Sequence, residues 1–98
     1  MDKNIELKTA MKNAYIDLQV KYNRSGAFDK IKIKPELDAL AKQINVLNMK
    51  LLNDATVVTD GDMLEMAEIK TEIDAAASKQ QLVAAIAKAV AFVAKKVV

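Results

Sequence analysis

Four acids near the middle of the chain, Asp60, Asp62, Glu65 and Glu68, are the residues best suited to chemistry. Carboxylate oxygens this close in sequence can bind a divalent cation. A calcium-binding loop that ended at Glu65 would, however, place Thr59 at its sixth position, where glycine is needed. Acids at the start of a helix also stabilise that helix without a ligand, because they oppose its dipole. We therefore predict a helix start here, with no metal ion and no cofactor.

The other residues that could do chemistry do not form a catalytic group. The chain has no His and no Cys, so it lacks the commonest general base, the commonest metal ligand and any thiolate nucleophile. Ser25 and Ser78 have no His to activate them. Lys88 lies among Ala and Val residues, but no motif places a substrate beside it. The sequence therefore predicts no catalytic residue, and we do not expect an enzyme.

Basic residues cluster in the first third of the chain. The set consists of Lys21, Arg24, Lys30, Lys32 and Lys34. Since Tyr22 and Phe28 could stack on bases, these residues form a candidate patch for anions or nucleic acid. A solvated loop that complements the acidic middle of the chain explains them too. Because the net charge is only +2 and the chain has a single Arg, we do not expect nucleic acid as a partner, and weak binding here is the last of three hypotheses.

The C-terminal segment 82–98 is apolar, and lysines are its only charged residues. Its predicted membrane face consists of Val83, Ile86, Val90, Val93 and Val97, with Lys88, Lys95 and Lys96. Phe92 falls outside this arc and Leu82 lies at its margin. Cationic amphipathic helices bind anionic membrane surfaces, whereas three charges in 17 residues do not suit a membrane span. A helix that is apolar around most of its circumference is also typical of one surrounded by neighbours.

Composition and charge favour a small helical domain. Ninety-eight residues suffice for one domain, and sixteen Ala, two Gly and one Pro indicate long helices. Residues 1–34 hold eight Lys or Arg and four acids, residues 35–78 three Lys and nine acids, and residues 79–98 four Lys and no acid. Such blocks can complement one another within the chain or between copies. The first residues carry charges without an apolar run, so we expect a cytoplasmic protein.

The pattern predicts a first helix over about 3–23 and an extended linker over 24–34. Apolar residues recur at helical spacing in the first segment, with Asp2 as a plausible N-cap and Gly26 as a left-handed C-cap. The alternation of Lys and Ile over 30–34 has the period of a strand, and we expect Ile31 and Ile33 to be buried in an extended conformation.

A second helix is predicted over about 35–53. Pro35 is favoured at the first helical position and pushes the residue before it towards extended geometry. Five apolar residues then follow at spacings of three and four, as in a coiled coil, namely Leu37, Leu40, Ile44, Leu47 and Leu51. Asn53 and Asp54 mark the end of this helix, and residues 55–58 connect it to the next.

A third, long helix is predicted over about 60–96. It opens at Thr59-x-x-Asp62, which resembles a capping box. Two heptad positions continue without a shift, one through Met66, Ile73, Gln80, Ala87 and Ala94 and the other through Ile69, Ala76, Val83, Val90 and Val97. Ser78-x-x-Gln81 resembles a second capping box and offers the alternative of a break. Because the heptad phase persists, we expect one continuous helix.

The predicted fold is all-α, one domain of residues 1–98 with three antiparallel helices, the last about twice as long as the second. We expect a non-catalytic helical interaction protein, such as an adaptor, chaperone or accessory factor, that forms a homodimer or higher oligomer or binds another protein. The predicted interface consists of Met66, Ile69, Ile73, Gln80, Val83, Val90 and Val97. Two antiparallel copies would set acids of residues 60–74 against the lysines after residue 78. The alternative is a peripheral membrane protein that uses its C-terminal helix.

Overall fold

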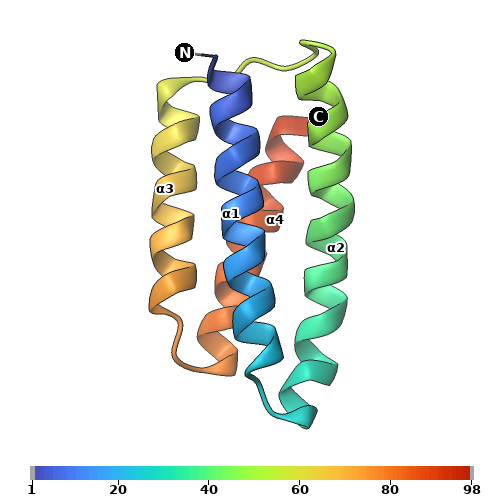
Figure 1. Cartoon of the computed structure of the whole chain (residues 1–98), viewed down its shortest axis with the longest axis vertical. Coiled ribbons are helices and arrows are strands. Elements are labelled where there is room, and N and C mark those ends of the chain that lie inside the picture. The colour runs from blue at the N-terminus through green and yellow to red at the C-terminus, as the bar shows by residue number, and fades with distance from the viewer. Residues whose placement is uncertain (1, 98) are drawn as a thin grey trace.

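The computed structural model describes residues 2–97, which fold into four helices (Figure 1). They are α1 (Lys3–Asn23), α2 (Ala27–Leu52), α3 (Asp60–Ala75) and α4 (Lys79–Val97). The described chain contains no strand. The all-α prediction is therefore confirmed, whereas the prediction of three helices is wrong.

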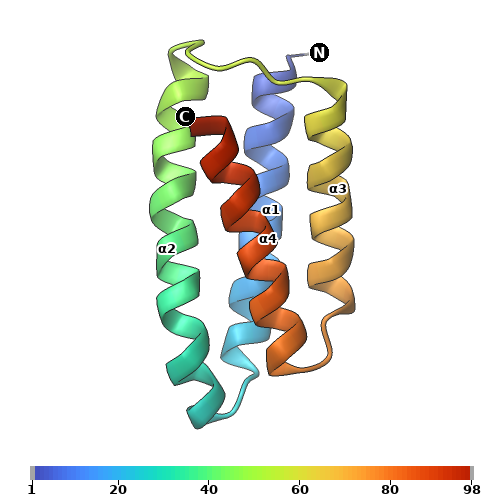
Figure 2. The same cartoon turned by 180° about the vertical axis from the view of Figure 1, so that it is seen from behind.

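The helices form a bundle in which α1 and α3 run in one direction and α2 and α4 run in the other (Figures 1 and 2). Each of α1 and α4 packs against both α2 and α3, so α1 lies diagonally opposite α4. The molecule measures 40 × 22 × 18 Å. At 1.5 Å per residue, α2 is about 39 Å long and spans the whole bundle. In both views α2 stands at the edge of the molecule.

The extended linker over 24–34 is not present, because α2 begins at Ala27. Ile33 is fully buried and stands at helical spacing from Leu37 and Leu40, which are buried on the same side of α2. Ile31 instead points to solvent and is 70% exposed. An isolated strand would leave its backbone groups unpaired, whereas the helix pairs them and still buries Ile33. The period of two was therefore a misleading signal.

Pro35 lies inside α2 rather than at its start. A proline in a helix cannot donate to the carbonyl four residues earlier, here that of Ile31. Both residues are exposed, so water can bond to this carbonyl. Gly26, with φ −68°, is the N-cap of α2 and not a left-handed C-cap. The left-handed residue is Asp54, with φ 52°, after the C-terminus of α2.

The predicted continuous helix over 60–96 breaks between α3 and α4. Ala76 takes an extended conformation, and residues 76–78 turn the chain back on itself. The Ser78 hydroxyl accepts a hydrogen bond from the Gln81 backbone N–H at 3.2 Å, and the Gln81 side chain accepts one from the Ala77 N–H at 2.7 Å. The alternative of a break at Ser78 is therefore correct, although Gln81 accepts the N–H of Ala77 rather than that of Ser78, so only half of a capping box forms.

The apparent heptad continuity arose because α4 is apolar on several sides. Its most buried side chains are Leu82, Ala85, Ile86, Ala89, Phe92 and Val93. These residues are out of phase with Val83, Val90 and Val97, which are only partly buried. Phe92, expected outside the apolar arc, is 1% exposed. The core therefore selects a different face of α4 from the one that the heptad pattern indicates.

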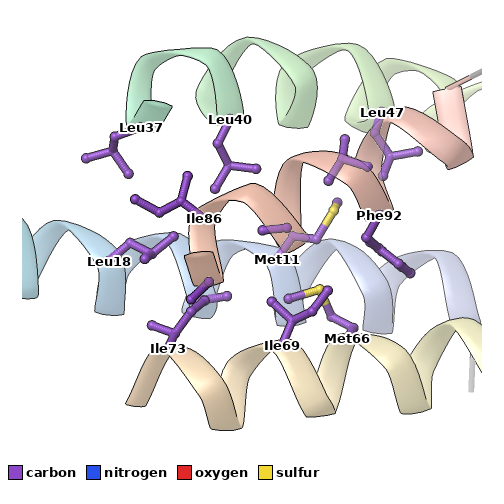
Figure 3. Close-up of a cluster of buried hydrophobic side chains, with 14 of the residues drawn as sticks. Met11, Leu18, Leu37, Leu40, Leu47, Met66, Ile69, Ile73, Ile86 and Phe92 are labelled. Carbon is purple, nitrogen blue, oxygen red and sulfur yellow. The ribbon is translucent and has the colours of Figure 1, made fainter. Parts of the chain in front are cut away.

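All four helices contribute side chains to a single core (Figure 3). Leu37, Leu40 and Leu47 of α2 point towards Met11 and Leu18 of α1 and Ile86 of α4. On the other side of α1 lie Met66, Ile69 and Ile73 of α3. Full burial of each such side chain stabilises the fold by roughly 1.5–3 kcal/mol.

Two predicted helix starts are confirmed by their caps. The Asp2 side chain accepts a hydrogen bond from the Asn4 N–H at 2.9 Å. Thr59 and Asp62 form both hydrogen bonds of a capping box, at 3.1 and 2.9 Å. These caps depend on residues at most three apart, so the local sequence was sufficient to predict them.

Candidate functional site

The residues expected at an interface between copies lie mostly in the core of the chain itself. Met66, Ile69 and Ile73 are buried in α3. Val83, Val90 and Val97 pack against the core and are partly exposed. Gln80 is exposed in the first turn of α4. The predicted membrane face also lies largely in the core, because Ile86 and Val93 are buried.

Three lysines of α4 pair with three acids of α3 within the hairpin. Lys88 pairs with Glu72, Lys95 with Glu65 at 2.8 Å, and Lys96 with Asp62 at 2.7 Å. The hydrogen bond that Lys95 donates to Glu65 raises the pKa of Lys95. Two of these pairs border a groove of about 320 Å³ between α3 and α4. The antiparallel complementarity expected between copies is therefore present inside the chain.

Asp62 is the most deeply placed acid of the four near the chain centre. Burial by itself would raise the pKa of Asp62, but hydrogen bonds from Lys96 and from the Thr59 backbone outweigh it, and the pKa is lowered. Lys96 Nζ also donates to the Val57 carbonyl, and Thr56 Oγ1 donates to the Lys96 carbonyl. These bonds fasten the loop before α3 to the end of α4.

The other acids of that group face different partners. Asp60 pairs with Lys3 of α1 at 3.0 Å, and Glu65 pairs with Lys95 of α4. Over residues 2–97, no three acids come together in a way that could hold a metal ion. Asp60, Asp62 and Glu65 each form an ion pair with another helix, and Glu68 borders the groove between α3 and α4.

A second ionic cluster joins the parallel helices α1 and α3. Lys70 lies between Asp17 of α1 and Asp74 of α3. Its hydrogen bond lowers the pKa of Asp17, and the same bond raises the pKa of Lys70. Both partners are about one-third exposed, so we assign the pair no more than about 0.5 kcal/mol.

The structure does not gather the five predicted patch residues at one place. Lys21 Nζ donates to the carbonyls of Asp74 and Ala76 at the end of α3. Lys30 lies 5.7 Å from the centre of the Tyr22 ring, and Lys34 pairs with Asp38 at 3.6 Å.

Arg24 borders a hollow of about 400 Å³ at the end of the bundle that carries the α1–α2 turn. Lys21, Lys79 and the acid Asp29 line the same hollow. Lys32 is exposed on α2.

An exposed row of apolar residues follows the outward face of α2. Half of the ten large apolar side chains that are exposed within residues 2–97 belong to this helix, and none belongs to α4. They are Phe28 at 86%, Ile31 at 70%, Val46 at 49%, Met49 at 64% and Leu52 at 79% exposure. At 100° per residue, the first four face away from the buried side of α2.

We define the outer stripe as Phe28, Ile31, Pro35, Lys42, Val46 and Met49. All six residues are exposed, and they extend along about 31 Å of α2. Sequence reasoning missed this stripe because residues 27–34 were assigned to an extended linker. Had the helix been recognised, the spacing would have shown a second apolar row opposite the buried one.

A shallow groove between α1 and α2 adds further apolar surface. It measures about 240 Å³ and is lined by Lys8, Lys12, Tyr15, Ile16, Ala41, Ile44, Asn45 and Asn48. The buried Oδ1 of Asn48 accepts no hydrogen bond within the described structure. An unpaired buried oxygen destabilises a fold by about 1–3 kcal/mol.

In residues 2–97, none of the helices combines the length and the hydropathy that crossing a bilayer requires. Comparison of the chain with protein-family models, with curated proteins and with solved structures finds no match.

Proposed function

We propose that this protein is a non-catalytic helical interaction protein that binds a protein surface through the outer stripe of α2. The observation that carries the proposal is the exposure of Phe28, Ile31, Val46 and Met49 along one face of one helix. They form two exposed apolar pairs about 22 Å apart along the helix, with Pro35 and Lys42 between them, and exposed apolar groups of this kind are typical of binding sites. Grooves of partner proteins commonly receive such a helix face through side chains one turn apart.

The polar groups support a structural rather than a catalytic role. The Ser25 hydroxyl donates to the Lys21 carbonyl at 2.9 Å, and the Ser78 hydroxyl caps α4. Lys70, Lys95 and Lys96 form ion pairs with acids of neighbouring helices. A nucleophile needs a nearby base, and neither Ser has a carboxylate among its hydrogen-bond partners.

The energetics favour a modest affinity. Each large apolar side chain contributes roughly 1.5–3 kcal/mol when it leaves water completely. Much of that sum is offset by the loss of translational freedom and by the ordering of side chains. A single helix face therefore suits reversible binding, as expected of an adaptor, chaperone or accessory factor.

The membrane alternative receives no comparable support. The apolar residues of α4 line the core, and Lys88, Lys95 and Lys96 are paired with acids of α3. To bind a bilayer by this helix, the protein would have to open its own bundle.

The proposal is tested by comparing three forms of the protein as immobilised baits in a lysate of the source cells. Ile31→Glu changes the outer stripe, and Leu64→Glu changes an equally exposed leucine on α3. We expect wild type and Leu64→Glu to retain the same protein, whether another protein or a further copy, and Ile31→Glu to lose it. After purification, the retained protein must bind wild type and Leu64→Glu but not Ile31→Glu. Binding that is identical for all three forms, or no binding at all, would overturn the proposal.

A further inference from the structure

The outer stripe has a symmetric spacing along α2. Its six residues follow one another at intervals of three, four, seven, four and three residues. The midpoint of this series falls between Asp38 and Ala39. Each residue before the midpoint therefore has a counterpart at the same distance after it.

We propose that α2 pairs antiparallel with α2 of a second copy about a two-fold axis at this midpoint. This inference rests on the proposed function and names the partner. In such a pair Phe28 meets Met49 of the second copy, Ile31 meets Val46, and Pro35 meets Lys42. A two-fold axis forms both halves of this contact from one self-complementary surface. The contact of Phe28 with the Met49 sulfur adds a favourable sulfur–aromatic interaction.

The charges near the midpoint select the antiparallel orientation. Lys42 stands opposite Pro35 of the second copy, and Asp38 of that copy is one helical turn away. The two copies thus form two equivalent Lys42–Asp38 ion pairs. Within the described residues Asp38 pairs with Lys34 at 3.6 Å, and both side chains are more than half exposed, so the Asp38 carboxylate is accessible. A parallel pair would place Lys42 against Lys42, which is repulsive.

The shape of the bundle leaves room for this pair. α2 occupies one edge of the molecule along its full length (Figures 1 and 2). Ala39 is exposed beside the midpoint, and its small side chain allows two helices to approach closely. The helices α1, α3 and α4 keep their packing. One helix pair is a small interface, so we expect a dissociation constant of about 1–100 μM.

Sedimentation equilibrium up to about 500 μM tests the pair, with variants that act only at the surface. We expect Ile31→Glu and Met49→Glu to weaken dimerisation at least tenfold, whereas Leu64→Glu leaves it unchanged. Lys42→Asp alone should weaken it. The double variant Lys42→Asp with Asp38→Lys should restore it, because the ion pairs return with reversed polarity. A wild-type protein that remains monomeric at this concentration would overturn the proposal.

Disulfide trapping tests the orientation, since the chain has no cysteine of its own. A mixture of Phe28→Cys and Met49→Cys proteins should form the mixed disulfide, and neither variant should crosslink with itself. Self-crosslinking of Phe28→Cys would show a parallel pair and contradict the proposal. If the protein is monomeric and yet Ile31→Glu alone abolishes capture of another protein, self-pairing is wrong and the proposed function still holds.

Discussion

Lys96 of α4 and Asp62 of α3 form an ion pair of 2.7 Å in which the side chains are only 13% and 11% exposed. The same Asp62 carboxylate accepts the Thr59 N–H of the capping box at 2.9 Å. One residue therefore starts α3, binds the end of α4 and, through Lys96, holds the loop at Val57. The loop from α2 and the end of α4 are thus tied to the beginning of α3.

Asp62→Asn should lower the free energy of unfolding by about 2 kcal/mol at neutral pH, since it leaves a nearly buried Lys96 without its counter-charge. The pKa of Asp62 is lowered from 3.8, so its stabilisation is complete above that value and is lost as the pH falls through the lowered pKa. When urea unfolding is measured from pH 7 to 2, the free energy of unfolding should fall less in Asp62→Asn than in wild type below about pH 4. Asp60→Asn, whose carboxylate is 92% exposed, is the matched control. Equal acid sensitivity of wild type and Asp62→Asn would contradict this assignment.

Asn48→Leu should stabilise the protein by about 1 kcal/mol, because it removes a buried oxygen that has no hydrogen-bond donor. Thermal and urea melts check the change. The control is Asn45→Leu, on the exposed side of the same groove, which should change stability by no more than about 0.5 kcal/mol. A destabilised Asn48→Leu protein would indicate that Asn48 bonds to an ordered water or to a partner.

Ser78→Ala should cost about 1 kcal/mol, because Ser78 caps the first turn of α4, and Ser78→Asp should preserve most of this. Insertion of two glycines between Ala77 and Ser78 tests the break itself. The turn should accept them with a small loss of stability, whereas the same insertion between Ala84 and Ala85 should unfold α4. Comparable damage from both insertions would support a continuous helix.

Vesicles that contain one-third anionic lipid should not pellet the folded protein at physiological ionic strength, because the apolar side of α4 faces the core. Co-sedimentation with neutral vesicles gives the background. Binding that increases with the anionic fraction, and that disappears in Lys95→Ala with Lys96→Ala, would favour the membrane alternative.

The features that depend on neighbours along the chain could be predicted from the sequence alone. They are the all-α class, the bounds of α1, the cap at Asp2 and the capping box of Thr59 and Asp62. In each case the pattern extends over a few residues, and hydrogen bonds within one turn decide it. Leu37, Leu40, Leu47 and Leu51 were recognised as one row for the same reason, and they are buried.

Where two patterns were both compatible with the sequence, packing between the helices selected one of them. Ile31 and Ile33 fit a strand as well as a helix, and the space beside Leu37 and Leu40 selects the helix that buries Ile33 alone. The turn at Ser78 exists because the folded hairpin lets α4 bury Phe92 and pair its lysines with the acids of α3. A helix as apolar as α4 has several possible faces, and its neighbours rather than its own residues choose among them. The outer stripe of α2 follows from the choice at Ile33, because Phe28 and Ile31 join it only when residues 27–34 are helical.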